Sequence, residues 1–461
     1  MTVPDWIHEA IFYQIFPDRF ANGDPGNDPV NVQAWGAEPN QKAYQGGDLA
    51  GIIQNLDYLS DLGINAIYLN PIFHSTANHR YHTVDFKKID PLLGTLDNFK
   101  NLIEEAHKRN IRIILDGVFN HCGRGFFAFA DVLENEEASP YKDWFHISSF
   151  PLNAYGKGKD HNYIGWWGIK DLPKFNIANA EVREYLFGAI RYWTALGIDG
   201  WRLDVPNEID DDGFWKEFRT EVRNINPEAY LVGEIWDVNP RWVNETHFDG
   251  LMNYPLRDAI LDVLRGKLEF AALSKVQARI EAAYAEHHHL AQYNLLASHD
   301  TRRPLSILEG DQEKLKLAYA CLFAFPGAPA IYYGDEIGML GNREPESRGA
   351  FSWDKNSWNN DIRDWIKKLI ALRADNISLR RGKYILQMQD EGRKILAFSR
   401  ISGEQEILFI ANFSNQGQQF DLEENLSFQM ITNKYSDLLS GEMLSGTTIN
   451  LDPYQAQVIA K

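Results

Sequence analysis

The chain has 461 residues, enough for a barrel domain of roughly 250 to 400 residues with smaller appended parts, so two or three domains are expected. Its formal net charge of −18 opposes contact with phosphate backbones, which are bound mainly by Lys and Arg, and this excludes nucleic acid as an expected partner. With 44% hydrophobic residues but no apolar run of about 18 residues, no membrane span is expected.

The amino terminus and the cysteines bear on the cellular location. Residues 1–20 contain early acidic residues and lack the basic start and unbroken apolar core of a secretory signal. Cys122 and Cys321 are too few for a disulfide framework and fit a reducing compartment. We therefore expect a cytoplasmic protein.

Short apolar runs alternate with amphipathic stretches up to about residue 375, a pattern typical of a parallel sheet with crossover helices. The predicted strands are residues 11–16, 66–69, 111–116, 200–205, 230–236, 251–254, 294–299 and 330–333. The clearest helical spacing covers residues 49–59, with Gly63 as C-cap, 181–196 and 214–222. Eight such repeats predict an α/β fold, a (β/α)8 TIM barrel with catalytic groups at the carboxyl ends of its strands.

Two further parts are predicted beside the barrel. Residues 121–174, after the third strand, form a long irregular segment rich in Gly, Asn and aromatic residues, and we interpret it as a subdomain overhanging the barrel mouth, a surface excursion being the alternative. After about residue 380 the period becomes two, which predicts a C-terminal antiparallel β-sandwich. The predicted division is a barrel over 1–120 and 175–380, an inserted subdomain over 121–174 and a sandwich over 381–461.

Four of the predicted strands end in a carboxylate. These acids are Asp116 after IRIIL, Asp204 in GWRLD, Glu234 in LVGE and Asp300 in NLLASHD. Barrel geometry points strand-end side chains toward one mouth. Because an unpaired buried carboxylate costs several kcal/mol, four acids at equivalent positions favour a functional site over structural salt bridges or strand-end caps.

Paired carboxylates suit the cleavage of a glycosidic bond. An acid protonates the leaving oxygen, and in a retaining enzyme a second carboxylate about 5 to 5.5 Å away attacks the anomeric carbon. Arg202 lies on the same strand face as Asp204 and is expected to keep this nucleophile ionised. Glu234 has apolar neighbours, Ile235 and Trp236, which are expected to raise its pKa for general-acid work.

Three histidines and the aromatic residues are candidates for holding a sugar. His82, His121 and His299 can donate hydrogen bonds to sugar hydroxyls, although a single histidine is more often a core or surface residue. Aromatic residues make up 13% of the chain, and sugar rings stack on such faces, but large barrels also bury many aromatics.

The acids lie in segments that resemble a known family. DGVFNH (116–121), GWRLDVPNE (200–208), GEIW (233–236) and NLLASHD (294–300) are similar to the four signature regions of the α-amylase superfamily, glycoside hydrolase family 13. LPKFN (172–176), MNYPLRDAI (252–260) and YYGDEIGM (332–339) narrow the resemblance to its neopullulanase, cyclomaltodextrinase and debranching-enzyme branch. The likeness covers nearly the whole chain.

The resemblance implies a role for each site residue. The implied catalytic residues are the nucleophile Asp204, the acid/base Glu234 and the transition-state stabiliser Asp300. The implied substrate-binding residues are Arg202, His121 and His299 orienting the bound ring, Tyr81 stacking beneath it, and Glu344 and Arg348 gripping a more distant glucose. Asp116 and His82 complete the predicted substrate-binding set.

Oxygen-bearing residues cluster in NGDPGND (22–28) and GGDL (46–49), and oxygen ligands are what calcium requires. On spacing alone a solvated Asx turn is equally compatible. The resemblance implies a structural Ca²⁺ held by Asn22, Asp24, Asn27, Asp28, the Gly46 carbonyl and Asp48. We expect no organic cofactor.

Three functions remain open. The favoured one is hydrolysis of α-1,4 bonds, α-1,6 bonds or both in maltooligosaccharides, cyclodextrins, pullulan or branched α-glucans, debranching included. A transglycosylase or 4-α-glucanotransferase would use the same site, with a sugar hydroxyl in place of water. A non-catalytic glucan-binding member is the third, but such members usually lose the acids that this chain retains.

The start of the chain departs from the pattern of this branch. Relatives typically begin with an extra β-sandwich domain that helps them dimerise and walls off the active site, whereas this chain starts almost at the first predicted strand. We therefore expect a cleft open to polymeric or branched substrates, and the resemblance allows a homodimer.

Overall fold

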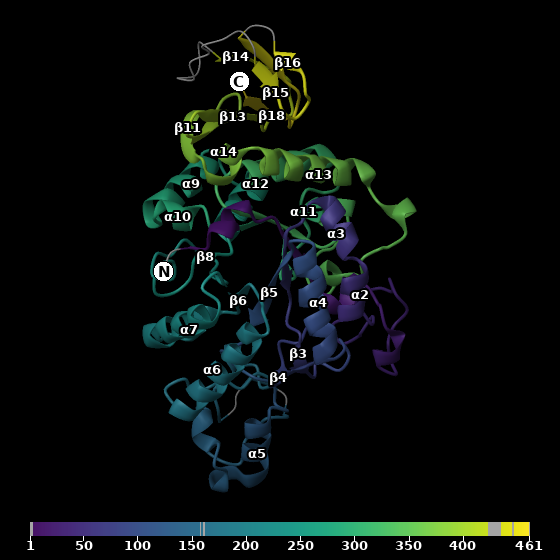
Figure 1. Cartoon of the computed structure of the whole chain (residues 1–461), viewed down its shortest axis with the longest axis vertical. Helices are drawn as coiled ribbons and strands as arrows, with labels where there is room; N and C mark the ends of the chain where they lie inside the picture. Colours follow the sequence, from purple (N-terminus) through teal and green to yellow (C-terminus); the bar gives the residue numbers. More distant parts are fainter. Residues whose placement is uncertain (1–2, 157, 160–161, 423–434, 445–446, 461) are drawn as a thin grey trace.

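A computed structural model describes residues 3–156, 158–159, 162–422, 435–444 and 447–460. Figure 1 shows a central barrel, with the segment that contains α5 (Phe127–Asn135) at one end of the long axis and the C-terminal strands at the other. No helix in these residues is long and apolar enough to cross a membrane.

A parallel sheet of eight strands forms the barrel within the described residues, in the order β8-β7-β6-β5-β2-β1-β10-β9. Its strands are β1 (Phe12–Ile15), β2 (Ala66–Leu69), β5 (Arg112–Gly117), β6 (Gly200–Leu203), β7 (Tyr230–Gly233), β8 (Gly250–Leu251), β9 (Tyr293–Leu295) and β10 (Ala328–Tyr332). A parallel bridge between Met252 and Tyr293 joins the two outer strands and closes the sheet. The predicted (β/α)8 barrel is confirmed.

The strands read as continuous apolar runs because both faces of the sheet are buried. Alternate residues of β1 belong to different cores: Phe12 packs inside the barrel, with its ring centroid 5.0 Å from that of Tyr293, whereas Tyr13 belongs to the larger core outside the barrel. The barrel interior is thus a packed core, and substrate can reach only its mouth.

Helices follow the strands around the barrel (Figure 1). They are α1 (Pro17–Phe20), α2 (Leu49–Gln54), α3 (Leu56–Leu62), α4 (Leu96–Lys108), α6 (Ala180–Ala195), α7 (Asp212–Ile225), α8 (Tyr254–Leu264), α9 (Ala272–Ala283), α10 (Glu286–His289), α11 (Pro304–Ile307), α12 (Gln312–Ala324), α13 (Asn360–Asp375) and α14 (Ile377–Arg381). The helix predicted over 49–59 is two helices broken at Asn55, whose side chain bonds to the carbonyl of Gly51. Gly63 caps α3 in the left-handed conformation, as predicted.

The segment between β5 and α6 is held together by aromatic packing. The ring of Phe129 in α5 lies 5.0 Å from that of Phe145 and 5.1 Å from that of Tyr163. A hairpin of β3 (Phe73–Ser75) and β4 (Thr83–Ile89), not predicted from the sequence, packs beside it, with Phe86 5.7 Å from Phe126. This hairpin presents Tyr81 and His82 near its turn, so it helps to build the barrel mouth.

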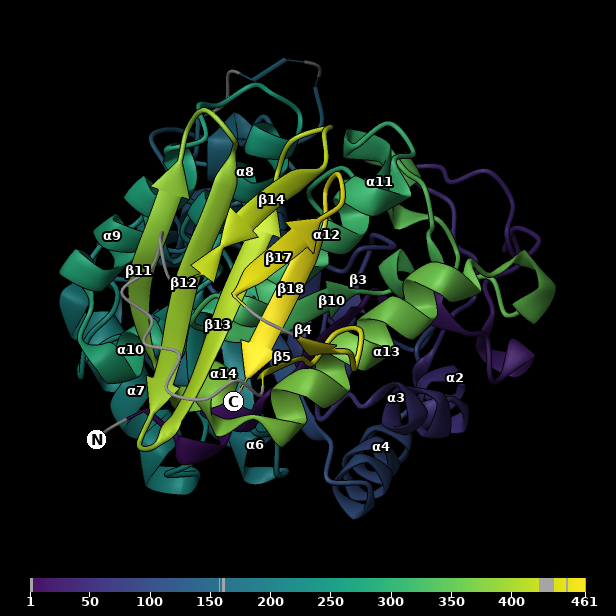
Figure 2. The same cartoon turned by 90° about the horizontal axis from the view of Figure 1, so that it is seen from above.

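The C-terminal strands form an antiparallel sandwich. The sheet β11-β12-β13-β18-β15-β16 faces the pair β14-β17 in the described residues, and Figure 2 looks onto these strands with the barrel behind them. The strands are β11 (Lys383–Asp390), β12 (Ile395–Ser402), β13 (Gln405–Asn412), β14 (Gln418–Asp421), β15 (Tyr435–Asp437), β16 (Met443–Leu444), β17 (Thr448–Leu451) and β18 (Ala456–Ala460). In β12, Ile395 faces the sandwich core while Phe398 packs on Phe325 of the barrel, at 4.9 Å between rings. The predicted sandwich is confirmed.

Candidate active site

The four predicted acids lie at the carboxyl ends of barrel strands or in the loops that follow. Asp116 lies within β5, while Asp204 and Glu234 come directly after β6 and β7. Asp300 follows β9 by a short loop, because this strand ends at Leu295 and not near residue 299 as predicted. Loop geometry, and not strand geometry, therefore places Asp300.

One guanidinium contacts three of these acids. Arg202 Nη1 lies 2.9 Å from Asp116 Oδ1 and 2.9 Å from Asp204 Oδ1, and Nη2 lies 2.9 Å from Glu234 Oε2. All four side chains are buried. Asp204 and Glu234 therefore share one site, as their predicted joint role requires.

Burial raises the pKa of Asp116, of Asp204 and of Glu234, and the charge of Arg202 lowers each of them only in part. The expected direction is thus found for Glu234. Arg202 lowers the pKa of Asp204, in the expected direction, but burial outweighs it because a single cation is shared by three desolvated acids. We therefore expect at least one of the three carboxyl groups to be protonated.

Hydrogen bonding distinguishes the three acids. Asp116 accepts bonds from the hydroxyls of Tyr68 (2.5 Å) and Tyr81 (2.7 Å) and from Arg202, and Asp204 accepts one from Arg202 Nη1. Glu234 accepts bonds from the backbone N–H of Val205 and, at 3.2 Å, from the indole of Trp236. Although Arg202 Nη2 is close to Glu234, its N–H groups are not aligned for a hydrogen bond. Of these three acids, Glu234 is thus the one that accepts no aligned hydrogen bond from the Arg202 guanidinium.

His299 links this cluster to Asp300. The amide N–H of Gln14 donates to His299 Nδ1 at 3.0 Å, so the ring proton is on Nε2, which faces the Tyr81 hydroxyl at 2.7 Å and Asp300 Oδ2 at 3.0 Å. Burial and the charges of Arg348 and Arg202 hold the pKa of His299 well below its usual value. A neutral imidazole that donates from Nε2 therefore orients Asp300.

Arg348 and Glu344 extend the site outward. Arg348 donates from Nε to the carbonyl of His299 at 2.9 Å and contacts Asp300 at 3.2 Å and Glu344 at 2.8 Å. Glu344 and Arg348 thus lie near Asp300, and the Arg348 side chain contacts both Glu344 and Asp300.

The remaining predicted sugar-binding residues, Tyr81, His121 and His82, stack on other rings or line a cavity. Tyr81 stacks on His299, with 5.3 Å between ring centroids and 6° between planes. His121 stacks on Trp166 at 5.4 Å, and burial lowers its pKa to about 3, so its ring is neutral. His82 and Glu344 line a cavity of about 650 Å³ that has aromatic walls at Tyr44 and Tyr155.

The chain matches two family models. Residues 14–382 match the model described as alpha amylase, catalytic domain, and residues 395–458 match the alpha-amylase SusG C-terminal domain. The chain belongs to the α-amylase family of glycoside hydrolases. The family predicted from the four motifs is confirmed.

Individual members of the α-amylase family are similar over nearly the whole chain. A cyclomaltodextrinase of Geobacillus thermopakistaniensis is 41% identical over 458 residues, which are 98% of this chain and 76% of the relative. Among solved structures, the cyclic α-maltosyl-(1→6)-maltose hydrolase from Arthrobacter globiformis, in complex with that sugar, is 40% identical with a TM-score of 0.92, and a debranching enzyme from Nostoc punctiforme is 39% identical with a TM-score of 0.88. Both solved chains and this chain are covered over 100% of their lengths.

Some residues of this α-amylase family site were missed by the sequence reasoning. Gln14 in β1, Tyr68 in β2 and Asn70 after β2 bond to His299, Asp116 and Tyr81 respectively. The sequence did contain a signal for Gln14, Tyr68 and Asn70, since each is a polar residue at the carboxyl end of an apolar strand, as the four acids are. Tyr254 stacks on Trp236 at 3.7 Å, and nothing in the sequence pattern pairs those two rings.

The predicted calcium ligands come together on one side of the barrel. Asp48 caps α2 and accepts bonds from the backbone N–H of Gly23 and Asp24 and from the amide of Asn27. Asp28 accepts two bonds from the amide of Asn22. A Cβ at Gly46 would lie 2.2 Å from Asp28 Oδ1, so only glycine fits this approach.

Two oxygens of this cluster decide whether it fits a cation. The side-chain oxygens of Asn22 and Asn27 are buried and have no hydrogen-bond partner in the described part of the chain. Unpartnered oxygens beside two carboxylates are a donor set that suits a hard cation such as Ca²⁺. The residues therefore fit the predicted calcium ion.

Proposed function

We propose that the protein is a retaining glycoside hydrolase that cleaves α-1,4 and α-1,6 glucosidic bonds by double displacement. The observation that carries this proposal is the contact of the Arg202 guanidinium with both Asp204 and Glu234. Two carboxylates on one guanidinium are close neighbours, and retaining enzymes keep their acids about 5 to 5.5 Å apart.

The hydrogen bonds support a division of labour between the two acids. Asp204, which accepts an aligned bond from Arg202, is the nucleophile that forms a bond to the anomeric carbon. Glu234 holds the proton, gives it to the leaving glycosidic oxygen, and then takes a proton from the water that releases the sugar from Asp204. Asp300, oriented by His299 and Arg348, lies where it can stabilise positive charge at the anomeric centre.

The substrates we propose are cyclic or branched α-glucans that contain α-1,6 linkages. In support, the solved relatives that match the whole chain include a hydrolase of cyclic α-maltosyl-(1→6)-maltose and a debranching enzyme. The cavity lined by His82, Glu344, Tyr44 and Tyr155 offers space for sugar units beyond the scissile bond, next to Arg348.

Two measurements test the proposal. Proton NMR at early times should show the α-anomer as the first product from a maltooligosaccharide, whereas first release of the β-anomer would contradict a retaining mechanism. Chromatography of products from cyclodextrin, pullulan, amylose and a branched dextrin should show cleavage at both bond types. Products longer than the substrate would indicate transglycosylation instead, and lack of turnover on all four would favour a glucan-binding protein.

We also propose a structural role for calcium. Asn22, Asp24, Asn27, Asp28, the Gly46 carbonyl and Asp48 would hold the ion, which would supply charge compensation to the three acids there and no chemistry to the reaction. A bound ion would tie the loop before α2 to the barrel.

Location and assembly stay predictions. Cys122 and Cys321 are buried free thiols, which supports a reducing, cytoplasmic location. A homodimer is to be checked by sedimentation equilibrium at several protein concentrations.

A further inference from the structure

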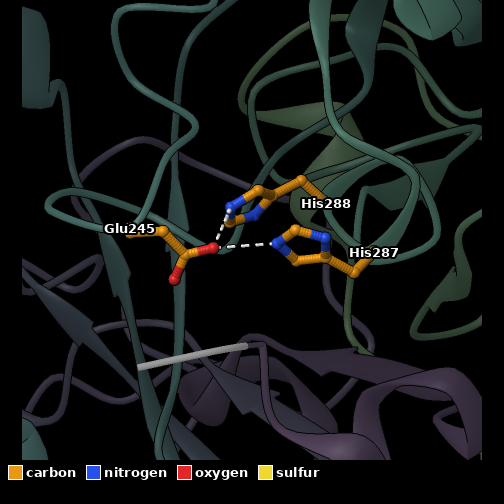
Figure 3. Close-up of side chains that lie close together, drawn as sticks. All are labelled: Glu245, His287 and His288. Atoms are coloured by element: carbon orange, nitrogen blue, oxygen red, sulfur yellow. Dashed lines mark hydrogen bonds and ion pairs between the residues drawn. The ribbon is translucent and has the colours of Figure 1, made fainter.

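A second cluster of polar side chains lies at the end of the barrel opposite the acids. Glu245 stands in the connection that leads into β8, and His287 and His288 belong to α10, which leads into β9. These connections enter the amino-terminal ends of strands, whereas the acids follow the carboxyl ends. Figure 3 shows both imidazole rings directed at one carboxylate oxygen of Glu245.

The three side chains converge closely. Glu245 Oε1 lies 2.9 Å from His287 Nε2 and 3.4 Å from His288 Nε2, and one ligand atom from each residue lies within 4.8 Å of the others. Ligand atoms around a tetrahedral zinc ion are roughly 3.3 Å apart, given bonds of about 2.0 to 2.1 Å. The spacing in the cluster is therefore close to that of a metal site.

A hydrogen-bond network accounts for His287 but not for His288. Nδ1 of His288 lies 2.8 Å from the backbone carbonyl of Asp249, which can only accept, so Nδ1 carries a proton and Nε2 is the ring nitrogen available to a metal. His288 is 3% exposed, and its Nε2 has no hydrogen-bond partner among the residues that the structure describes, although it faces the Glu245 carboxylate. Nε2 of His288 and the Glu245 carboxylate thus converge on one point, as the ligands of a bound metal ion do.

We propose that Glu245, His287 and His288 bind a divalent transition metal of the zinc type. Two imidazole nitrogens and one carboxylate are ligands that Zn²⁺ accepts, with water in the fourth position, whereas Ca²⁺ prefers oxygen alone. The bond from His288 Nδ1 to a backbone carbonyl is the arrangement that fixes the ring of a metal-binding histidine.

The metal would act on stability and not on the reaction. It would join the connection before β8 to α10, two segments more than 40 residues apart that meet at this end of the barrel. Because it would bind the folded state preferentially, zinc should raise the melting temperature while leaving kcat unchanged.

The experiment uses the full chain without a histidine tag, freed of metal with a chelator and then titrated with ZnCl₂ by calorimetry. We expect one zinc ion per chain at this site and a rise in Tm of a few degrees at about 0.1 mM zinc. Glu245→Gln and His287→Ala should each weaken zinc binding by at least about tenfold. Glu286→Gln, an exposed acid in the same short helix, is the matched control and should bind zinc as the native chain does.

Several results would overturn the proposal. Equal zinc affinity in the native chain, Glu245→Gln and His287→Ala would do so, as would lack of zinc binding by the native chain. Zinc lost in Glu234→Gln but kept in His287→Ala would place the metal at the catalytic acids instead. The metal-free Tm of each variant shows that it is folded, and Co²⁺ absorption in the visible range, present in the native chain and Glu286→Gln only, reports the nitrogen ligands directly.

Discussion

The backbone N–H of Val205 donates a 3.0 Å hydrogen bond to Oε2 of Glu234. Val205 adopts the left-handed conformation, with φ 36° and ψ 52°, which is unfavourable for a β-branched residue. Since Val205 directly follows Asp204, this strained turn positions Asp204 and also donates the hydrogen bond to Glu234. Strain of this kind is retained where the surrounding structure needs it, commonly at active sites.

The second oxygen of Glu234 is bonded by Trp236, and Trp236→Phe removes that bond while keeping a ring to stack on Tyr254. Since a donor to a carboxylate stabilises its ionised form, its loss should raise the pKa of Glu234 by up to about one unit. The alkaline limb of the kcat/KM profile should then move to higher pH. Trp6→Phe, whose indole bonds to the distant Glu228 carbonyl, is the control. An alkaline limb that stays in place or moves down would count against the assignment of Glu234 as the acid.

Asp204→Asn removes the proposed nucleophile and nearly preserves the volume of the side chain. We expect kcat to fall by at least about 10³-fold on any α-glucan that the native chain cleaves, with the fold intact by circular dichroism. Asp97→Asn, at an exposed position in the first turn of α4, should leave kcat unchanged. Turnover by Asp204→Asn close to the native rate would rule out this nucleophile.

Arg202→Lys replaces the shared guanidinium with a point charge that cannot reach three acids at once. We expect a loss of a few kcal/mol in the free energy of unfolding, because buried carboxylates lose their partner. Less compensation also raises the pKa of Asp204, so the acid limb of the activity profile should move to higher pH. Arg279→Lys, in a surface pair with Asp237, is the control, and an unshifted acid limb in Arg202→Lys would contradict the shared-cation account.

His289 gives stability a defined pH dependence. Burial lowers its pKa to about 4 from the ordinary value of 6.5, so between these values the unfolded chain binds a proton that the folded chain does not. The free energy of unfolding therefore rises with pH through this window and loses this contribution as the pH falls. His289→Gln should reduce that slope by up to about 1.4 kcal/mol per pH unit. Urea unfolding at about pH 5 and pH 7 measures it, and an unchanged slope would show that His289 is protonated in the folded state.

Calcium removal tests the proposed ion site. We expect Tm to be higher by a few degrees in about 1 mM CaCl₂ than in EGTA, because the ion binds only the folded arrangement of these loops. Asp28→Asn should abolish the difference, since it removes a carboxylate that lies against Asn22, while Asp97→Asn should retain it. The same Tm with and without chelator in the native chain would show that the cluster is a hydrogen-bonded turn.

Much of the fold could be predicted because it is encoded by local patterns. Each barrel strand is an apolar run bounded by turn residues, and Gly63 ends its helix in the left-handed conformation that other residues disfavour. The β3-β4 hairpin was missed because its strand from Thr83 to Ile89 alternates only weakly between buried and exposed residues. The break at Asn55 was missed because the apolar spacing continues across it.

The sequence by itself determined which acids follow which strands, because strand order and strand direction bring the carboxyl ends to one mouth. Only the tertiary structure decided how those acids are charged. The raised pKa of Asp204, the sharing of Arg202 and the proton on His299 Nε2 each depend on burial and on atoms from segments far apart in the chain. Desolvation and Coulomb energy vary with distance in space, and a sequence pattern does not record that distance.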